Sequence, residues 1–208
     1  MSPRATRCGS SPIGASRSGS SIKTTRQLLG TLVIVTTETD VLIGFLDTQR
    51  EHALGILEGL SEEQLRSSVL PSGWSPLAMV KHLALAVEHY WIRCIVAGES
   101  LDFFTENGLQ DDGEWRLSAQ DTGPSIFALY RSEWARSNEI IRATPLDAPP
   151  AIKEEWWGEW EVTDLRFIVL HLIEETACHA GHLDAARELM DGRQWLAFSG
   201  DEEWPSGE

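Results

Sequence analysis

The sequence predicts an all-α fold, and three observations support this prediction. Apolar residues recur at the 3.6-residue spacing of amphipathic helices in four separate segments. No segment shows the strict alternation of a half-buried strand. Helices of this length bury their apolar faces best against one another, so we expect a four-helix bundle. Two long connections, residues 98–123 and 145–162, permit crossovers between the helices.

The first helix is predicted over residues 39–60, and a short helical turn opens after it at Ser61. The buried stripe of this helix comprises Leu42, Phe45, Leu46, Ala53, Leu54, Leu57 and Leu60. The second helix is predicted over residues 76–97. Ser75 is a favourable N-cap, a proline suits the first helical position, and a glycine follows the end. The apolar face of the second helix comprises Leu77, Val80, Leu83, Ala84, Val87, Trp91 and Ile95.

The third helix is predicted over residues 125–142, because the apolar pattern stops before Pro145. Its inward residues are Ile126, Phe127, Tyr130, Trp134 and Ile141. The fourth helix is the longest, from a cap at Thr163 through Met190. Gly192 lies just past its end, where a left-handed residue commonly closes a helix.

Residues 1–36 have the composition of a disordered tail. Ser, Gly, Arg and Thr dominate this segment, which contains five basic residues and no acidic residue. The composition changes near Val33, just before the first helical pattern, so we expect the genuine chain to start near Val33 or Val35. The predicted organisation is therefore a disordered basic tail over residues 1–36, for which a mis-assigned start and a transit peptide are alternative explanations, and one metal-binding helical domain over residues 37–208.

The helical domain is strongly acidic. Once the five basic residues of the tail are set aside, 12 Lys and Arg stand against 32 Asp and Glu, a net charge of −20. Such a surface repels phosphate backbones, which argues against nucleic acid as a partner. No stretch approaches the roughly 18 consecutive apolar residues of a membrane helix, so we expect no membrane span.

Three cysteines, Cys8, Cys94 and Cys178, form no C-x-x-C pair and are odd in number. This pattern argues against a disulfide scaffold and favours a reducing compartment, so we predict a cytoplasmic protein. Cys94 and Cys178 lie within helical patterns, and we expect both to be buried, inert thiols.

The segment HLIEETACHAGH, from His171 to His182, holds the clearest chemical pattern. Residues four apart on a helix differ by about 40° around the axis and about 6 Å along it, so Glu175 and His179 project side by side. His171 and His182 fall on the same stripe, because eleven residues make three turns plus about 20°. Ionisable groups on an inward stripe need partners, and a metal ion supplies one.

An open metal site uses about three protein ligands, so a third ligand must come from another helix. His82 is the strongest candidate because it lies mid-helix among apolar residues, and His89 and His52 are alternatives. Imidazole with carboxylate suits zinc, nickel, iron or manganese, and two nitrogens favour zinc or nickel. Spacing alone leaves another interpretation open, in which Glu175 and His179 form a surface pair and His82 is an ordinary core histidine.

Four motifs together resemble the DinB-like superfamily. They are LEGLSEEQL at residues 57–65, PSGWSPL at 71–77, VKHL at 80–83 followed by Tyr90-Trp91, and HLIEETACHAGHLD at 171–184. The likeness covers residues 37–192 and is strongest to the mini-circle protein branch, a domain of unknown function. It extends to the metal-binding domain of mycothiol-dependent maleylpyruvate isomerase.

The resemblance implies up-down-down-up connectivity and a metal held by one histidine of the second helix and two ligands of the fourth. Carried onto this chain, the metal ligands are His82, Glu175 and His179. Many members have histidine at the position of Glu175, whereas the maleylpyruvate isomerase branch also uses His, Glu and His. The chemistry that the resemblance implies is thiol-dependent, with mycothiol or a similar small thiol as the co-substrate.

We therefore expect a divalent-metal-dependent S-transferase or isomerase that acts on a small electrophile, with zinc favoured over nickel. His182 is the candidate catalytic residue, which orients a ligand or carries a proton. Lys81, Arg93 and Arg187 are the candidate positive charges beside an anionic cofactor. Two alternatives stay open: a non-catalytic metal-binding or stress-response bundle with His182 or His171 as a fourth ligand, and a purely structural bundle. A homodimer is compatible with each.

Overall fold

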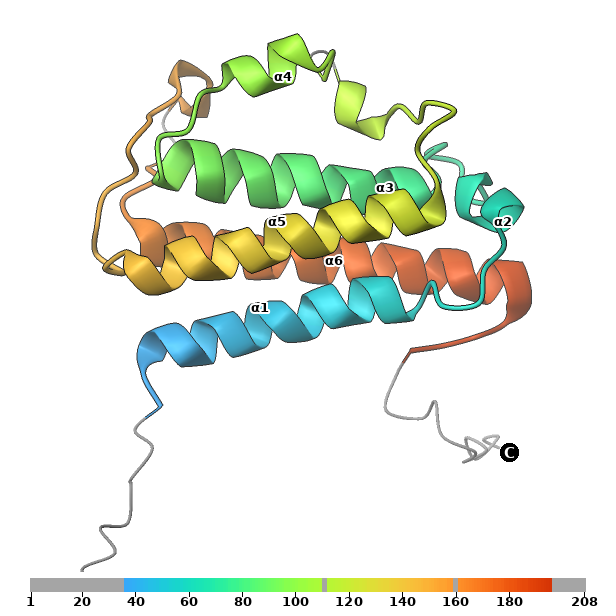
Figure 1. The fold of residues 1–208 in the computed structure, drawn as a ribbon. Coiled ribbons are helices and arrows are strands. Elements are labelled where there is room, and N and C mark those ends of the chain that lie inside the picture. The colour runs from blue at the N-terminus through green and yellow to red at the C-terminus, as the bar shows by residue number, and fades with distance from the viewer. Residues whose placement is uncertain (1–35, 110–111, 159–160, 196–208) are drawn as a thin grey trace, which may run out of the picture. The chain divides into compact units, whose positions relative to one another are not determined.

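The computed structural model describes residues 36–109, 112–158 and 161–195, and the domain they form confirms the predicted fold class. Four long helices pack together, and no strand occurs within these ranges (Figure 1). The elements are α1 (Glu38–Gly55), α2 (Glu62–Arg66), α3 (Pro76–His82), η1 (Leu83–Val96), α4 (Asp102–Glu106), η2 (Gly113–Trp115), α5 (Gly123–Ala143), η3 (Glu155–Trp157) and α6 (Leu165–Asp191). The predictions for the tail and for Cys8 fall on residues 1–35, outside the described part.

The helices have the up-down-down-up connectivity that the resemblance implied. In Figure 1, α1 and α6 run in one direction, whereas the continuous α3–η1 helix and α5 run in the other. Helix α1 packs along α6, and η1 packs along α5. The connection from η1 to α5 crosses back over the bundle and carries α4 (Figure 1). Residues 98–123, predicted as a loop, therefore contain two short helical turns.

Capping side chains explain most of the helix starts. Thr37 and Ser61 form capping boxes at α1 and α2, and the Ser75 hydroxyl accepts a hydrogen bond from the Ala78 N–H at the start of α3. Helix α6 starts one residue later than predicted, because the side chain of Asp164, not Thr163, accepts from the Phe167 N–H. The predicted end is confirmed, since Gly192 closes α6 with a φ of 77°.

The predicted apolar stripes form the core, with one clear error in α1. Leu46, next to Phe45 in the chain, is fully buried, whereas Phe45 itself is 62% exposed. Arg50, on the same helix, is fully buried. An arginine on α1 therefore occupies a core position that the apolar periodicity did not predict, and the phenylalanine that it did predict lies at the surface. The arginine is buried because its charge meets a partner inside the bundle.

The second long helix changes its winding part of the way along. Its first seven residues, α3, are α-helical, and from Leu83 the hydrogen bonds of η1 run from residue i to i+5, the π-helical pattern. More residues per turn mean that a seven-residue step no longer returns to the same face. His82 and His89, expected on similar faces, therefore have separate surroundings.

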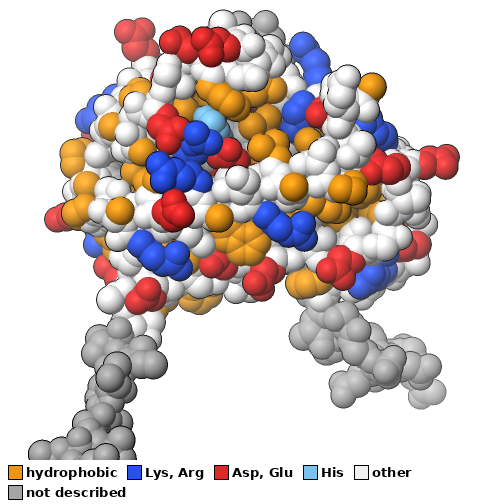
Figure 2. All heavy atoms as spheres, viewed as in Figure 1, with side chains coloured by type: hydrophobic (Ala, Val, Ile, Leu, Met, Phe, Trp, Pro, Cys, Tyr) orange, Lys and Arg blue, Asp and Glu red, His pale blue; other side chains and the backbone are white. Residues whose placement is uncertain are grey.

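The surface of the helical domain is mixed in charge. Figure 2 shows acidic and basic side chains interspersed with hydrophobic ones over the face drawn. Within the described residues, no helix combines the length and the apolar character that a membrane crossing requires.

Candidate metal centre

Helix α6 places Glu175 and His179 side by side, as the four-residue spacing predicts. His179 Nε2 lies 3.0 Å from Glu175 Oε1, a hydrogen-bonding distance. The helix is continuous from Leu165 to Asp191, so the spacing between the two side chains is set by regular α-helical geometry.

His82, at the end of α3, brings a third donor from the neighbouring helix. Its Nε2 lies 3.9 Å from Glu175 Oε1, and its ring centroid lies 5.0 Å from that of His179, edge to face. One ligand atom from each of His82, Glu175 and His179 lies within 4.8 Å of the other two. Of the His, Cys, Asp and Glu side chains in the described ranges, these three alone form such a group.

The hydrogen-bonding state of these imidazoles fits a metal ion. Both ring nitrogens of His82 and Nδ1 of His179 are buried and without a hydrogen-bond partner in the described structure. Leaving a buried polar group unpaired costs roughly 1–3 kcal/mol, so native proteins seldom tolerate several in one place. Zinc bonds to imidazole and carboxylate are roughly 2.0–2.2 Å long, and donor atoms that all lie within 4.8 Å of one another are grouped closely enough to be candidate ligands of one ion.

The surroundings keep Glu175 ionised. Its hydrogen bond with His179, and then the imidazole of His82, hold the pKa of this carboxyl group well below its usual range. Trp115 of η2 stacks on His82 with ring centroids 4.1 Å apart, and Glu114 Oε1 lies 3.8 Å from His82 Nδ1. An ionised carboxylate between two imidazoles is the donor set that a divalent cation requires.

The other predicted histidines lie apart from this group. His171 packs edge-on against Trp91, and burial lowers its pKa. His182 is exposed, and its ring centroid lies 5.7 Å from that of His179. His89 Nδ1 lies 3.3 Å from a carboxylate oxygen of Glu133 on α5. His52, the last alternative, contacts Asp184, with its Nε2 2.8 Å from Oδ1.

The three cations suggested for an anionic cofactor are engaged by acidic side chains. Lys81 is paired with Asp121, Arg93 with Glu99 and Glu133, and Arg187 with Asp191. These charges stabilise the bundle and its connections.

The two thiols within the described residues differ. Cys94 is buried, as predicted, and burial raises the pKa of its thiol to about 11. The prediction for Cys178 is wrong, because this side chain is exposed and its Sγ lies 4.0 Å from Nδ1 of His182. Cys178 follows Glu175 by three residues, but it points off the buried stripe of α6.

A cavity of about 350 Å³ opens beside the group, lined by His82, Ala86, Val87, Tyr90, Trp91, His171 and Glu175. Sequence reasoning placed Trp91 in the core and did not foresee this cavity. It also missed Trp115 and Glu114, which approach His82 from the connection between η1 and α5. Trp115, a tryptophan in a Gly/Asp-rich segment, was the available signal. It lies 33 residues after His82 in the chain, so no local pattern could predict their contact.

The comparison with protein families identifies the chain. The family model described as mycothiol-S-transferase matches residues 41–192, which include every long helix apart from the first turn of α1. No curated protein and no solved structure matches the chain. The match confirms the DinB-like resemblance and the expectation of a thiol-dependent transferase. The chain belongs to the mycothiol-S-transferase family, whose enzymes transfer the thiol mycothiol to an electrophilic substrate.

Proposed function

We propose that this protein is a metal-dependent mycothiol S-transferase in which His82, Glu175 and His179 hold the metal. The substrate that receives mycothiol is a small apolar electrophile. The observation that carries this proposal is the set of buried, unpartnered imidazole nitrogens around an ionised carboxylate. Two nitrogens and one oxygen favour zinc, with nickel next. A thiol cofactor also requires a reducing compartment, which supports a cytoplasmic location.

A divalent metal at this site supplies Lewis acidity, which favours the thiolate form of a bound thiol near neutral pH. The chain's own residues prepare the site. Glu175 orients His179 through their 3.0 Å contact, and the Trp115 indole covers one face of the His82 ring. Three protein donors leave room for an exogenous ligand, as in catalytic rather than structural zinc sites.

His182 is proposed to accept the proton that the thiol releases. Its ring is exposed one turn beyond His179, with the two ring centroids 5.7 Å apart. An exposed imidazole in that position can exchange protons with solvent, as a proton acceptor beside a site must.

The electrophile is proposed to occupy the cavity of about 350 Å³ that His82 and Glu175 line. Apolar and aromatic side chains, among them Val87, Tyr90 and Trp91, form most of its remaining wall. Burial lowers the pKa of His171, so this cavity wall carries a neutral imidazole. A small, uncharged, apolar or aromatic electrophile fits such a lining better than an anion does.

The experiment is metal analysis by plasma mass spectrometry, combined with a transferase assay using mycothiol and a chromogenic aromatic halide. We expect about one zinc or nickel ion per chain after reconstitution, and activity that a chelator abolishes. His82→Ala and Glu175→Ala should lose metal and activity while keeping the helical circular-dichroism signal.

The matched control is His52→Ala, because His52 is also a partly buried histidine beside a carboxylate but lies outside the site. This variant should keep both metal and activity. Metal retention with inactivity across many electrophiles would indicate a non-catalytic binding protein, and absence of metal after reconstitution would overturn the proposed site.

A further inference from the structure

A second cavity, of about 500 Å³, is lined by Trp115 but by none of the three proposed metal ligands. We propose that this cavity binds the sugar part of mycothiol, an inference that rests on the proposed function. The residues that carry the argument are Arg66, Ser72, Trp74, Ser75 and Trp115.

Two tryptophans join this cavity to the metal centre. Trp115 lines the cavity and also stacks on His82, with ring centroids 4.1 Å apart. Trp74 lines the cavity and lies against His182, with ring centroids 6.1 Å apart. A ligand in the cavity therefore contacts side chains that directly touch the residues proposed to hold the metal and to accept the proton.

The lining combines aromatic faces with hydrogen-bonding groups. Indole rings offer large flat surfaces on which the C–H faces of a sugar ring can pack, and each indole also has one N–H donor. The Ser75 hydroxyl accepts from the Ala78 N–H at 3.3 Å, and no described residue accepts its own proton. Ser72 adds a second, exposed hydroxyl. Alternating donors and acceptors are what a polyhydroxylated ligand requires.

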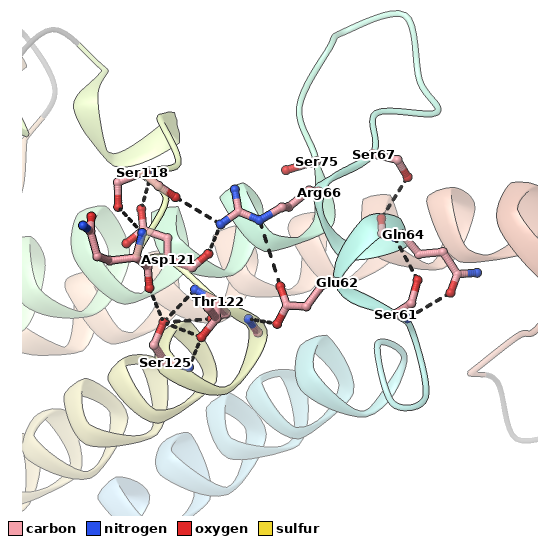
Figure 3. Close-up of polar contacts among 12 residues, drawn as sticks. Ser61, Glu62, Gln64, Arg66, Ser67, Ser75, Ser118, Asp121, Thr122 and Ser125 are labelled. Carbon is pink, nitrogen blue, oxygen red and sulfur yellow. Dashed lines mark hydrogen bonds and ion pairs between the residues drawn. The ribbon is translucent and has the colours of Figure 1, made fainter.

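Arg66 is held in place at the edge of this cavity. Its Nη2 donates to the carbonyl oxygens of Ser118 and Asp121, and its Nε lies 4.0 Å from a carboxylate oxygen of Glu62. Figure 3 shows the guanidinium reaching from α2 toward Ser118 and Asp121, with Glu62 on its other side. No described residue bonds to Nη1, which leaves this nitrogen as a positioned donor.

The charge of the cavity selects a neutral ligand. Arg66 is the one charged residue among those that line it, and Glu62 already offsets that charge. A phosphate or carboxylate ligand would need uncompensated cations, whereas a neutral polyol needs hydrogen bonds and flat apolar surface. Mycothiol has this chemistry, because its cysteine is amide-linked to a neutral glucosamine–inositol pseudodisaccharide. The volume lies within the roughly 300–1,000 Å³ of small-molecule sites.

The test is calorimetric titration of the full-length protein with the N-acetylated glucosamine–inositol pseudodisaccharide, which lacks the thiol and keeps the sugar nitrogen as an uncharged amide. Binding of this probe requires neither metal nor turnover. We expect saturable binding that Trp74→Ala weakens by about tenfold or more. Ser72→Leu should weaken it similarly by filling the cavity without removing a packed side chain. Ser68→Leu is the matched control, because Ser68 is equally exposed but does not line the cavity.

A second measurement compares mycothiol with N-acetylcysteine as the thiol in the transferase assay. Ser72→Leu should raise KM for mycothiol by about tenfold and change KM for N-acetylcysteine far less, whereas Ser68→Leu should leave both values unchanged. If the wild type is active but uses both thiols equally well, and the pseudodisaccharide does not bind, this inference fails while the proposed function stands. If the pseudodisaccharide binds with the expected variant pattern and no transfer occurs, the proposed function fails and the sugar site stands.

Discussion

Two polar clusters lie inside the same bundle, and they differ in whether their hydrogen-bonding capacity is used up. The first is centred on the fully buried Arg50 of α1. The second is the group of His82, Glu175 and His179. In the first, protein acceptors bond the Arg50 guanidinium on all three nitrogens, whereas the second leaves buried imidazole nitrogens without a hydrogen-bond partner.

The Arg50 cluster ties three helices together. Arg50 donates through Nε and Nη2 to both oxygens of Glu88 on η1, each at 2.6 Å. Its Nη1 donates to Asp47 on its own helix and to Asn138 on α5, both at 2.8 Å. Bidentate, charge-assisted pairing of this kind uses nearly the whole guanidinium fork.

The histidine cluster has the same ingredients in a different state. Its carboxylate is paired with His179, but three ring nitrogens of His82 and His179 have no hydrogen-bond partner in the described structure. The contrast teaches that burial of charge alone does not mark a site. What distinguishes the candidate site is a group of buried imidazole nitrogens without hydrogen-bond partners, beside an ionised carboxylate and a cavity.

The largest expected effect is a loss of stability when the Arg50 cluster is broken. Glu88→Ala should lower the free energy of unfolding by roughly 3–5 kcal/mol, because it leaves Arg50 as an unpaired buried charge. Urea unfolding followed by circular dichroism measures this. Glu51→Ala, on an exposed position of the same bundle, should change stability by less than about 0.5 kcal/mol. If both substitutions lowered the free energy of unfolding equally, the ion pair between Arg50 and Glu88 would contribute no more to stability than an exposed residue does.

The next largest effect is a gain in thermal stability when metal binds the group of His82, Glu175 and His179. Zinc at about 100 times its Kd should stabilise the protein by about 2.7 kcal/mol, a rise in Tm of roughly 5–10 °C. His179→Ala should abolish this rise, whereas His89→Ala, in a histidine paired with Glu133, should retain it. Thermal scans with zinc and with chelator measure both. A full rise in His179→Ala would place the metal elsewhere.

A smaller effect, opposite in sign to that of Glu88→Ala, is expected at His82 in the absence of metal. Its two buried, unpartnered nitrogens cost stability, so His82→Leu should raise the free energy of unfolding of the metal-free protein by about 1 kcal/mol. The same variant should lose metal binding. Urea unfolding in the presence of chelator measures this change. A loss of about 2 kcal/mol or more in the free energy of unfolding, on the order of a core truncation, would show that His82 stabilises the fold instead.

The smallest effect is a difference in reactivity between the thiols of Cys94 and Cys178. Burial raises the pKa of Cys94 to about 11, so at pH 8 only on the order of one thiol in a thousand is ionised, and it is also enclosed. Cys178 is exposed and should react with iodoacetamide. In a Cys8→Ser background, intact-mass analysis should find one adduct on the native protein and two after denaturation. Two adducts on the native protein would contradict the burial of Cys94.

Local chemistry in the sequence was sufficient for much of the fold. Ser75, Pro76 and Gly192 mark helix ends through interactions within one turn, so their roles follow from residue type alone. The errors arose where a position depends on distant partners. Periodicity placed Phe45 inside, but the fully buried Arg50 takes a core position on the same helix because Glu88 lies 38 residues away to receive its charge.

The candidate site divides in the same way. Residue spacing alone determined that Glu175 and His179 lie together, because four residues make just over one turn of any α-helix. The sequence favoured His82 over His89 as their neighbour but could not separate the two by geometry. The tertiary structure does, because α3 packs against α6 and the π-helical winding of η1 turns His89 toward Glu133 of α5. The same holds for Trp115 and the two cavities, which depend on a connection folding back across the bundle, and long-range packing of that kind is not encoded in any local pattern.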